Sequence, residues 1–365
     1  MKKKKMKTDD VKKMLTQKRK KETLTAKDFL STGSTLLNLA CTGHPERGFI
    51  KGRYYFLVGD STSGKTWLSL TCLAEASINP NFKDYRFIYD NSEDGALMSI
   101  EHFFGKCVAA KMEAPRMCKG EPVYSETIED FYYNVDDAIK DGRPFIYIED
   151  SMDSLSSEAE GDKFDSNKKA RRAGKESKGS YGDGKAKVNS SMLRRVIGKK
   201  LKQSGSILIV ISQTRAKMNA MPFESPKTNS GGYALKFYAC LQILSSVAGQ
   251  IKKSVKGKQR QLGVDCKIRV KKNRITGRDR TVVIPIYHSF GIDDVGSCVD
   301  YLLDEKCWVK GDEIKAKGLG IKGSKKKIIR LIEQQGLEKD LHELVGDVWN
   351  EIEEACVIKR KRRYE

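Results

Sequence analysis

The chain has 365 residues, of which 39% are hydrophobic and 32% are charged, enough for one large α/β core with small extensions or for two modest domains. Its 69 Lys and Arg exceed its 48 Asp and Glu and leave a net charge of +21 at pH 7. This surplus favours a polyanionic partner over simple solubility, because each cation placed on a phosphate releases condensed counterions. The nine cysteines form no C-x-x-C pair and the four histidines lack metal-ligand spacing, which argues against a disulfide framework or a zinc module.

The N-terminal MKKKKMK is not followed by an apolar segment, so we expect no signal peptide. No stretch approaches the ~18 to 20 apolar residues that span a bilayer, so we expect no membrane contact. These features predict a cytoplasmic protein.

In chain order, residues 1–30 are predicted as a basic N-terminal arm, with eleven Lys or Arg in the first 21 positions. A short helix and a disordered arm are both compatible with this composition. Residues 31–305 are predicted as the core, because apolar runs alternate with helical stretches, which is typical of a mainly parallel sheet covered by helices. The predicted strands are 53–59, 86–90, 144–150, 206–213, 266–274 and 280–287, and the predicted helix after the first strand is 66–77.

Residues 160–202 interrupt this pattern, because they are rich in Lys, Ser and Gly and poor in core formers. Asp162 to Lys202 contain fourteen basic and four acidic residues, a local net charge of +10. We predict a long flexible loop there, followed by a basic helix. Residues 251–261 are predicted as a second basic loop, and 306–365 as a small, mainly helical C-terminal α/β subdomain with a basic tail.

The strongest motif is GDSTSGKT at 59–66, which matches G-x-x-x-x-G-K-[ST] between a predicted strand and a predicted helix. Its glycines let backbone N–H groups point at phosphate oxygens, and the helix N-terminus adds positive potential. We expect Lys65 to contact the β and γ phosphates of ATP and the Thr66 hydroxyl to bind Mg²⁺. The predicted ATP-binding residues are Gly59, Asp60, Ser61, Thr62, Ser63, Gly64, Lys65, Thr66 and Asp150.

A P-loop requires a second acid near the metal, at the end of a neighbouring strand. Asp150 follows the apolar run FIYIE and is predicted as the second Mg²⁺ ligand beside Thr66. The simpler interpretation is that Asp150 or Glu149 only ends the strand.

Two further strand ends carry polar candidates. Glu93, in YDNSED, is the best candidate to orient the attacking water, and Asp90 and Asp94 lie near enough to compete with it. Gln213 ends the fourth strand, where an amide can bond the γ-phosphate and report its loss.

Taken together, these motifs resemble those of the RecA family of bacteria and phages. STGSTLLNLA resembles the entry motif, FIYDNSED the strand with the catalytic glutamate (with one residue inserted), and IEDSMDSL the second acidic motif. ISQTRAKMN, followed by FESPKTNSGGYALKFYA, resembles the switch glutamine, the second DNA loop and the ALKFY segment. VKKNRI resembles the segment that reaches the nucleotide of the adjacent subunit. The resemblance covers about residues 30 to 310 and continues more weakly to 350.

The resemblance implies a RecA-like P-loop ATPase core and a role for each matching position. It implies that residues 214–230 form a DNA loop controlled by Gln213, and that 160–190 take the place of the first DNA loop. The implied catalytic residues are Glu93, Lys65, Gln213, Lys272 and Arg274, the last two acting across the subunit interface. The implied DNA-binding residues are Lys168, Lys169, Arg171, Arg172, Arg215, Lys217, Phe223, Lys227, Gly231 and Gly232. The implied interface residues are Lys236, Phe237, Lys272 and Arg274.

The function implied is ATP-dependent strand exchange between single-stranded DNA and a homologous duplex, with DNA-stimulated ATP hydrolysis. The expected partners are these DNAs, further copies of the chain in a helical filament, and mediator and single-strand-binding proteins; a ring assembly stays open. The first alternative is a helicase or branch-remodelling ATPase, which would need an added N-terminal domain or zinc module. The second is a signalling or metabolic ATPase, which the basic charge disfavours. The divergence and the short termini suggest a phage or prophage origin.

Overall fold

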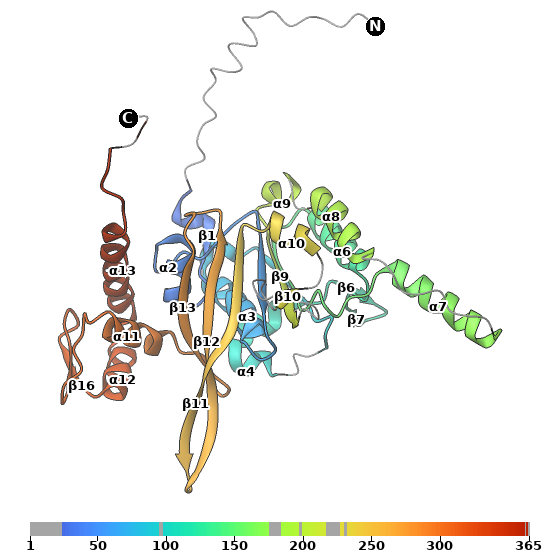
Figure 1. Cartoon of the computed structure of the whole chain (residues 1–365). Helices are drawn as coiled ribbons and strands as arrows, with labels where there is room; N and C mark the ends of the chain where they lie inside the picture. The colour runs from blue at the N-terminus through green and yellow to red at the C-terminus, as the bar shows by residue number, and fades with distance from the viewer. Residues whose placement is uncertain are drawn as a thin grey trace, which may run out of the picture.

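The computed structural model describes residues 24–94, 98–174, 184–196, 199–216, 227–229, 232–361 and 363. Its centre is a ten-stranded sheet in the order β14-β13-β12-β11-β3-β9-β8-β4-β5, with β10 paired to β9 (Figure 1). The pairs from β11 through β3, β9, β8 and β4 to β5 are parallel, whereas β12, β13 and β14 continue the sheet antiparallel. The sheet strands are β3 (Arg53–Gly59), β4 (Arg86–Asp90), β5 (Met112–Glu113), β8 (Phe145–Glu149), β9 (Ile207–Ala216), β10 (Lys227–Asn229), β11 (Leu241–Val255), β12 (Lys258–Asn273), β13 (Arg280–Tyr287) and β14 (Gly291–Ile292).

Helices cover both faces of the parallel part of the sheet. Alternate residues of β3 enter two different apolar clusters, because successive side chains of a strand point to opposite faces. Tyr54 and Phe56 lie in the cluster under the helices α6, α8 and α9, whereas Tyr55 and Leu57 lie in the cluster under α2 and α3. These helices are α2 (Thr35–Thr42), α3 (Lys65–Ile78), α6 (Ile128–Asp141), α8 (Gly184–Val196) and α9 (Lys199–Ser204). The predicted fold class, a mainly parallel sheet flanked by helices, is confirmed.

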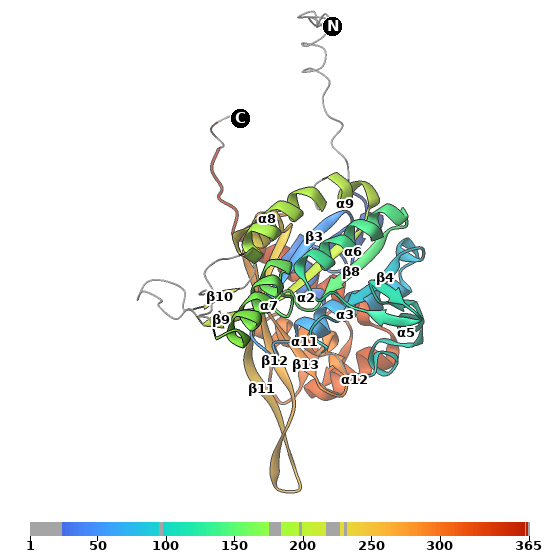
Figure 2. The ribbon, with the colours of Figure 1, turned by 90° about the vertical axis from the view of Figure 1, so that its right-hand side faces the viewer.

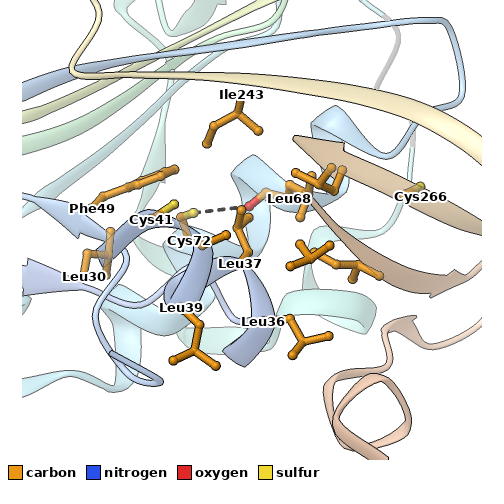
Figure 3. Close-up of a cluster of buried hydrophobic side chains, with 14 of the residues drawn as sticks. Leu30, Leu36, Leu37, Leu39, Cys41, Phe49, Leu68, Cys72, Ile243 and Cys266 are labelled. Atoms are coloured by element: carbon orange, nitrogen blue, oxygen red, sulfur yellow. Dashed lines mark hydrogen bonds between the residues drawn. The ribbon is translucent and has the colours of Figure 1, made fainter. Parts of the chain in front are cut away.

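The second of these clusters is continuous from the start of the core to the C-terminal segment. Figure 3 shows α2 and α3 side chains such as Leu37 and Leu68 facing Ile243 of β11, with the Cys72 thiol donating to the Leu68 carbonyl. Trp308, Ile328 and Leu341 of the C-terminal segment belong to the same cluster. That segment comprises α11 (Asp294–Asp304), β15 (Ile314–Ala316), β16 (Ile321–Gly323), α12 (Lys325–Gln335) and α13 (Glu338–Ala355).

Apart from α7, the remaining elements are short. They are η1 (Ala26–Asp28), β1 (Phe29–Leu30), β2 (Phe49–Ile50), η2 (Pro80–Phe82), α4 (Ile100–Phe104), α5 (Lys106–Lys111), β6 (Arg116–Cys118), β7 (Glu121–Val123), α7 (Glu158–Arg172) and α10 (Gly232–Tyr238). The predicted basic segment before residue 24 lies outside the described residues. Among the described helices, none is long and apolar enough to cross a bilayer.

The prediction of a flexible loop at the start of the 160–202 insert was wrong, because α7 occupies its first part and projects from the body (Figure 1). Ser157 and Glu160 form a capping box at its start, and Lys169, Arg171 and Arg172 lie in its last turn, where the helix dipole favours cations. No residue of α7 is buried. The composition suggested a loop because a helix without a buried face shows no apolar periodicity.

The prediction of a basic loop at 251–261 was also wrong. β11 and β12 stay paired as far as Val255 and Lys258, and the resulting hairpin projects from the body in both views (Figures 1 and 2). Lys256 and Gly257 close it with positive φ angles of 51° and 74°, as a two-residue type I′ turn requires. The strands pass beyond the sheet, so neither face is buried and the alternation that identifies a strand is absent.

Candidate nucleotide-binding site

The P-loop joins the carboxyl end of β3 to the first turn of α3, in the central part of the sheet. Gly64 stands before α3 with φ +81°, a left-handed conformation that favours glycine. A Cβ on Gly64 would lie 2.4 Å from the Ile286 Cδ1 and 3.1 Å from the Cys266 Sγ. A Cβ on Gly59 would lie 2.3 Å from the Ser245 carbonyl oxygen. Both glycines are therefore required by close packing of the loop against β11, β12 and β13.

Lys65 is buried at the start of α3, and its ammonium group is held inside the loop. The Nζ donates to the carbonyl oxygens of Gly59 at 3.1 Å and Asp60 at 2.7 Å. Burial lowers the pKa of Lys65, and the carboxylates of Asp150 and Glu93 oppose that shift. The cation is thus already directed to the concave side of the loop.

Thr66 and Asp150 come from different elements and meet beside the P-loop. The Thr66 hydroxyl donates to the Asp150 Oδ2 at 2.7 Å, and the Tyr89 hydroxyl donates to the same oxygen at 3.2 Å. Burial raises the pKa of Asp150, and the two hydrogen bonds oppose that rise. The sequence motifs do not identify Tyr89, although it stands next to the last residue of β4.

The neighbouring carboxylates Asp90 and Glu149 form hydrogen bonds with other residues. Asp90 accepts bonds from the backbone N–H and hydroxyl of Ser125 and from the Tyr147 hydroxyl, at 2.9, 2.5 and 2.6 Å. Glu149 accepts from the Ser92 hydroxyl at 2.6 Å, and burial together with the Asp90 charge raises its pKa well above the ordinary value. Both carboxylates are fully buried, so neither is accessible to a ligand at the P-loop.

Glu93 and Gln213 are joined across the carboxyl edge of the sheet. The Gln213 side-chain amide donates to the Glu93 Oε1, and the Gln213 backbone N–H donates to Asp153 at 2.6 Å. Gln213 is also the register partner of Gly59 in the β3–β9 pair. Asp94, the competing candidate, has φ +47° and is exposed. The structure therefore brings Glu93 and Gln213 together beside the P-loop.

Comparison with known proteins agrees with this arrangement. The profile of the RecA N-terminal domain matches residues 167–293. The chain is 28% identical over 288 residues to Protein RecA of Xanthomonas axonopodis pv. citri, covering 77% of this chain and 72% of that protein. It is 29% identical over 277 residues to Protein RecA of Cytophaga hutchinsonii (74% and 67% covered) and 26% identical over 319 residues to that of Acinetobacter baylyi (86% and 80%).

The chain belongs to the RecA family. The matched profile begins at residue 167, after the P-loop, so it is evidence separate from the 59–66 motif. It includes β9 with Gln213, α10 and the β11–β13 part of the sheet.

Within this RecA-family core, Lys272 and Arg274 lie at the far end of the sheet from the P-loop. Lys272 pairs with Gln242, which pairs with Phe56 at the middle of β3. The Arg274 N–H donates to the carbonyl of Cys240, whose own N–H donates to Tyr54 near the amino end of β3, whereas the P-loop follows its carboxyl end. The Lys272 Nζ donates to the carbonyls of Lys236 and Phe237 at 2.7 Å, and the Arg274 guanidinium donates to Phe237 at 2.6 Å. Both cations also lie 5.8 Å from the centre of the exposed Phe237 ring.

The described DNA-binding positions implied for a RecA-family member lie on α7, β9, β10 and α10. Lys168, Lys169, Arg171 and Arg172 lie along the exposed α7. Arg215 and Lys227 lie in the antiparallel ladder of β9 and β10, which frames the segment between them. Lys217, Phe223 and Gly231 lie outside the described residues. Gly232 starts α10 with φ +80°, and a Cβ there would lie 2.9 Å from the Ala186 Cβ, so this glycine allows α10 to approach α8.

Proposed function

We propose that this RecA-family protein assembles on single-stranded DNA in an ATP-dependent filament and pairs it with a homologous duplex, with DNA-stimulated ATP hydrolysis. The observation that carries the proposal is the Gln213–Glu93 hydrogen bond at the P-loop. The strand that ends in this switch glutamine continues into the β9–β10 ladder. One side chain is thus positioned to couple the nucleotide state to a DNA-facing segment.

ATP would be held by the P-loop residues 59–66, and Mg²⁺ by Thr66 and Asp150. A hydroxyl and a carboxylate are the hard oxygen donors that Mg²⁺ prefers, and they already lie 2.7 Å apart. When bound, Mg²⁺ would neutralise part of the phosphate charge. The protein directs the Lys65 ammonium and the N-terminus of α3 at the phosphates. The glycines of the loop keep side chains out of the space that the phosphates would occupy.

Glu93 is the proposed residue that orients and deprotonates the attacking water. It is exposed and already bonded to Gln213, whereas Asp90 and Glu149 are buried and engaged elsewhere. In this proposal Gln213 leaves Glu93 to bond the γ-phosphate, and loss of that phosphate reverses the exchange. The backbone of β9 then transmits the change to 214–230.

Lys272 and Arg274 are proposed to act on the nucleotide of the adjacent subunit. Their position at the amino end of β3 supports action in trans, because they lie away from their own P-loop. They hold the C-terminal carbonyls of α10, so Lys236 and Phe237 form one surface with them. A filament in which this surface meets the neighbour's P-loop would make assembly and ATP binding interdependent.

The proposed DNA contacts are the basic residues of α7 and the segment 214–230. Thirteen of the fifteen residues of α7 are exposed, and its last turn carries three cations. The basic C-terminal end of this projecting helix can contact a phosphate backbone without sequence preference.

The test is ATP-dependent exchange between circular single-stranded DNA and a homologous linear duplex. The wild type would be compared with Lys65→Ala and with Lys106→Ala, an exposed lysine outside the site. Product from the wild type and Lys106→Ala, but not from Lys65→Ala, supports the proposal. DNA-stimulated ATP hydrolysis with unwinding of a forked duplex, and without pairing of homologues, would replace it with the helicase alternative.

A further inference from the structure

Three metal-ligating side chains converge near the C-terminal end of α3, whose N-terminal end carries the P-loop. Asp294 and Cys298 are four residues apart on α11 and therefore share one helix face. His342 comes from α13, and its Nε2 lies 3.0 Å from the Asp294 Oδ2. One ligand atom from each of the three residues lies within 4.8 Å of the other two.

The carboxylate of this cluster is held in a fixed orientation by the start of α2. The Thr35 backbone N–H donates to the Asp294 Oδ1 at 2.7 Å, and the Thr35 hydroxyl donates to the Oδ2 at 2.8 Å. Hydrogen bonds of this kind orient the ligands of protein metal sites. Cys298 has no exposed surface, so its sulfur faces the interior side of the cluster.

The surroundings are negatively charged. An open cavity of about 470 Å³ beside the cluster is lined by the carboxylates of Glu46, Glu75, Asp294 and Glu338. His342 is the one basic side chain among the described residues that line it. A His–Asp ion pair neutralises one of these carboxylates, so the cavity favours a further cation.

We propose that Asp294, Cys298 and His342 bind a transition-metal dication of the zinc class. An imidazole nitrogen, a thiolate and a carboxylate are together a donor set that Zn²⁺ accepts and that Mg²⁺ does not favour. With bonds of about 2.0 to 2.3 Å, tetrahedral ligand atoms lie roughly 3.3 to 3.8 Å apart, so the cluster must close by about an ångström. Water from the cavity fills the fourth position.

Binding would release two protons to solvent, one from the Cys298 thiol as the sulfur–metal bond forms and one from the His342 imidazolium Nε2 that now pairs with Asp294. His342 exchanges its hydrogen bond with Asp294 for a bond to the metal, and the Thr35 bonds are retained. The metal would then join α13 of the C-terminal segment to α11. The site is separate from the Thr66–Asp150 pair, so this inference does not rest on the proposed function.

The experiment uses the full-length protein, stripped with a chelator and titrated with Co²⁺ as a spectroscopic probe for Zn²⁺. We expect one equivalent of Co²⁺ to give a thiolate-to-cobalt charge-transfer band, and Zn²⁺ to displace it. Cys298→Ser, which keeps the side-chain size, abolishes the band, and His342→Ala weakens affinity on the order of a hundredfold. Matched controls are Cys72→Ser, a buried cysteine on α3, and His102→Ala, and both keep the band.

Thermal unfolding gives a second readout that does not depend on ATPase activity. Zn²⁺ raises the unfolding midpoint of the wild type and the controls, and raises that of the two ligand variants much less. The comparison is between each variant with and without metal, and far-UV circular dichroism checks that each is folded. A wild type without the band, or a band that survives Cys298→Ser, overturns the proposal.

Discussion

A buried ion pair joins the last helix to the antiparallel edge of the sheet, and its removal has a predictable cost. Arg280 of β13 donates to both carboxylate oxygens of Glu353 on α13, at 2.5 and 2.7 Å, and Arg278 lies 2.8 Å from one of them. Breaking a fully buried pair costs about 3 to 5 kcal/mol. Glu353 is 6% exposed, but about a third of the Arg280 side chain reaches solvent, and Gln at 353 still accepts one bond. We therefore expect Glu353→Gln to lower the free energy of unfolding by about 2 kcal/mol.

The loss of unfolding free energy in Glu353→Gln also depends on pH, and its direction can be predicted. The hydrogen bonds from Arg280 lower the pKa of Glu353 below its ordinary value of 4.5. A carboxyl group with a lowered pKa contributes its full stability above its unfolded-state value and loses it as pH falls through the folded-state value. The difference between wild type and Glu353→Gln is thus constant near pH 7 and shrinks below about pH 4.5.

The assay is equilibrium urea unfolding at pH 7 and at pH 4, with Glu354→Gln as the control. Glu354 is the next residue of α13 and is exposed, so its substitution is expected to change stability by less than about 0.5 kcal/mol. An equal loss in both variants, or a Glu353→Gln loss that does not shrink at low pH, would refute this reasoning.

Three further outcomes are expected. Glu93→Gln keeps an acceptor for the Gln213 amide but removes the proposed base, so single-turnover ATP hydrolysis falls by about 100-fold or more while nucleotide affinity holds; unchanged hydrolysis assigns the base elsewhere. Gly64→Ala forces a methyl group against the Ile286 Cδ1 and lowers the free energy of unfolding in urea by about 2 to 4 kcal/mol. Adding Ile286→Val removes that Cδ1 and recovers about 1 kcal/mol; a double variant whose loss equals the sum of the two single losses would contradict the clash. Lys272→Ala lowers DNA-stimulated ATPase activity about 1,000-fold, and mixing it with Lys65→Ala subunits restores part of the activity; no restoration argues against action in trans.

Features that depend on neighbouring residues were predictable from the sequence. The P-loop was found because a strand, a glycine-rich turn and a helix follow one another within 26 residues, 53–78. The strands 86–90, 144–150 and 206–213 were found because both faces of a parallel sheet are covered, which makes each strand a continuous apolar run. Their carboxyl ends share one edge, so the sequence also indicated that Glu93, Asp150 and Gln213 would gather beside the P-loop.

Solvent-exposed regular structure was not predictable in the same way. α7 and the β11–β12 hairpin have regular backbones but bury little, so their sequences resemble loops. Hydrophobic periodicity arises where one face of an element is buried, so an element that projects into solvent does not show it.

The sequence by itself determined the family, the P-loop and the positions of the parallel strands along the chain, because these follow from local pattern and motif. Only the tertiary structure decided which carboxylates are accessible: Asp150 meets Thr66, whereas Asp90 and Glu149 turn into a buried network. It also brought together the Asp294–Cys298–His342 cluster, whose members lie on two helices separated by α12 and a hairpin. Such contacts join segments far apart in the chain, and packing of the whole core, which no local pattern encodes, sets their distances.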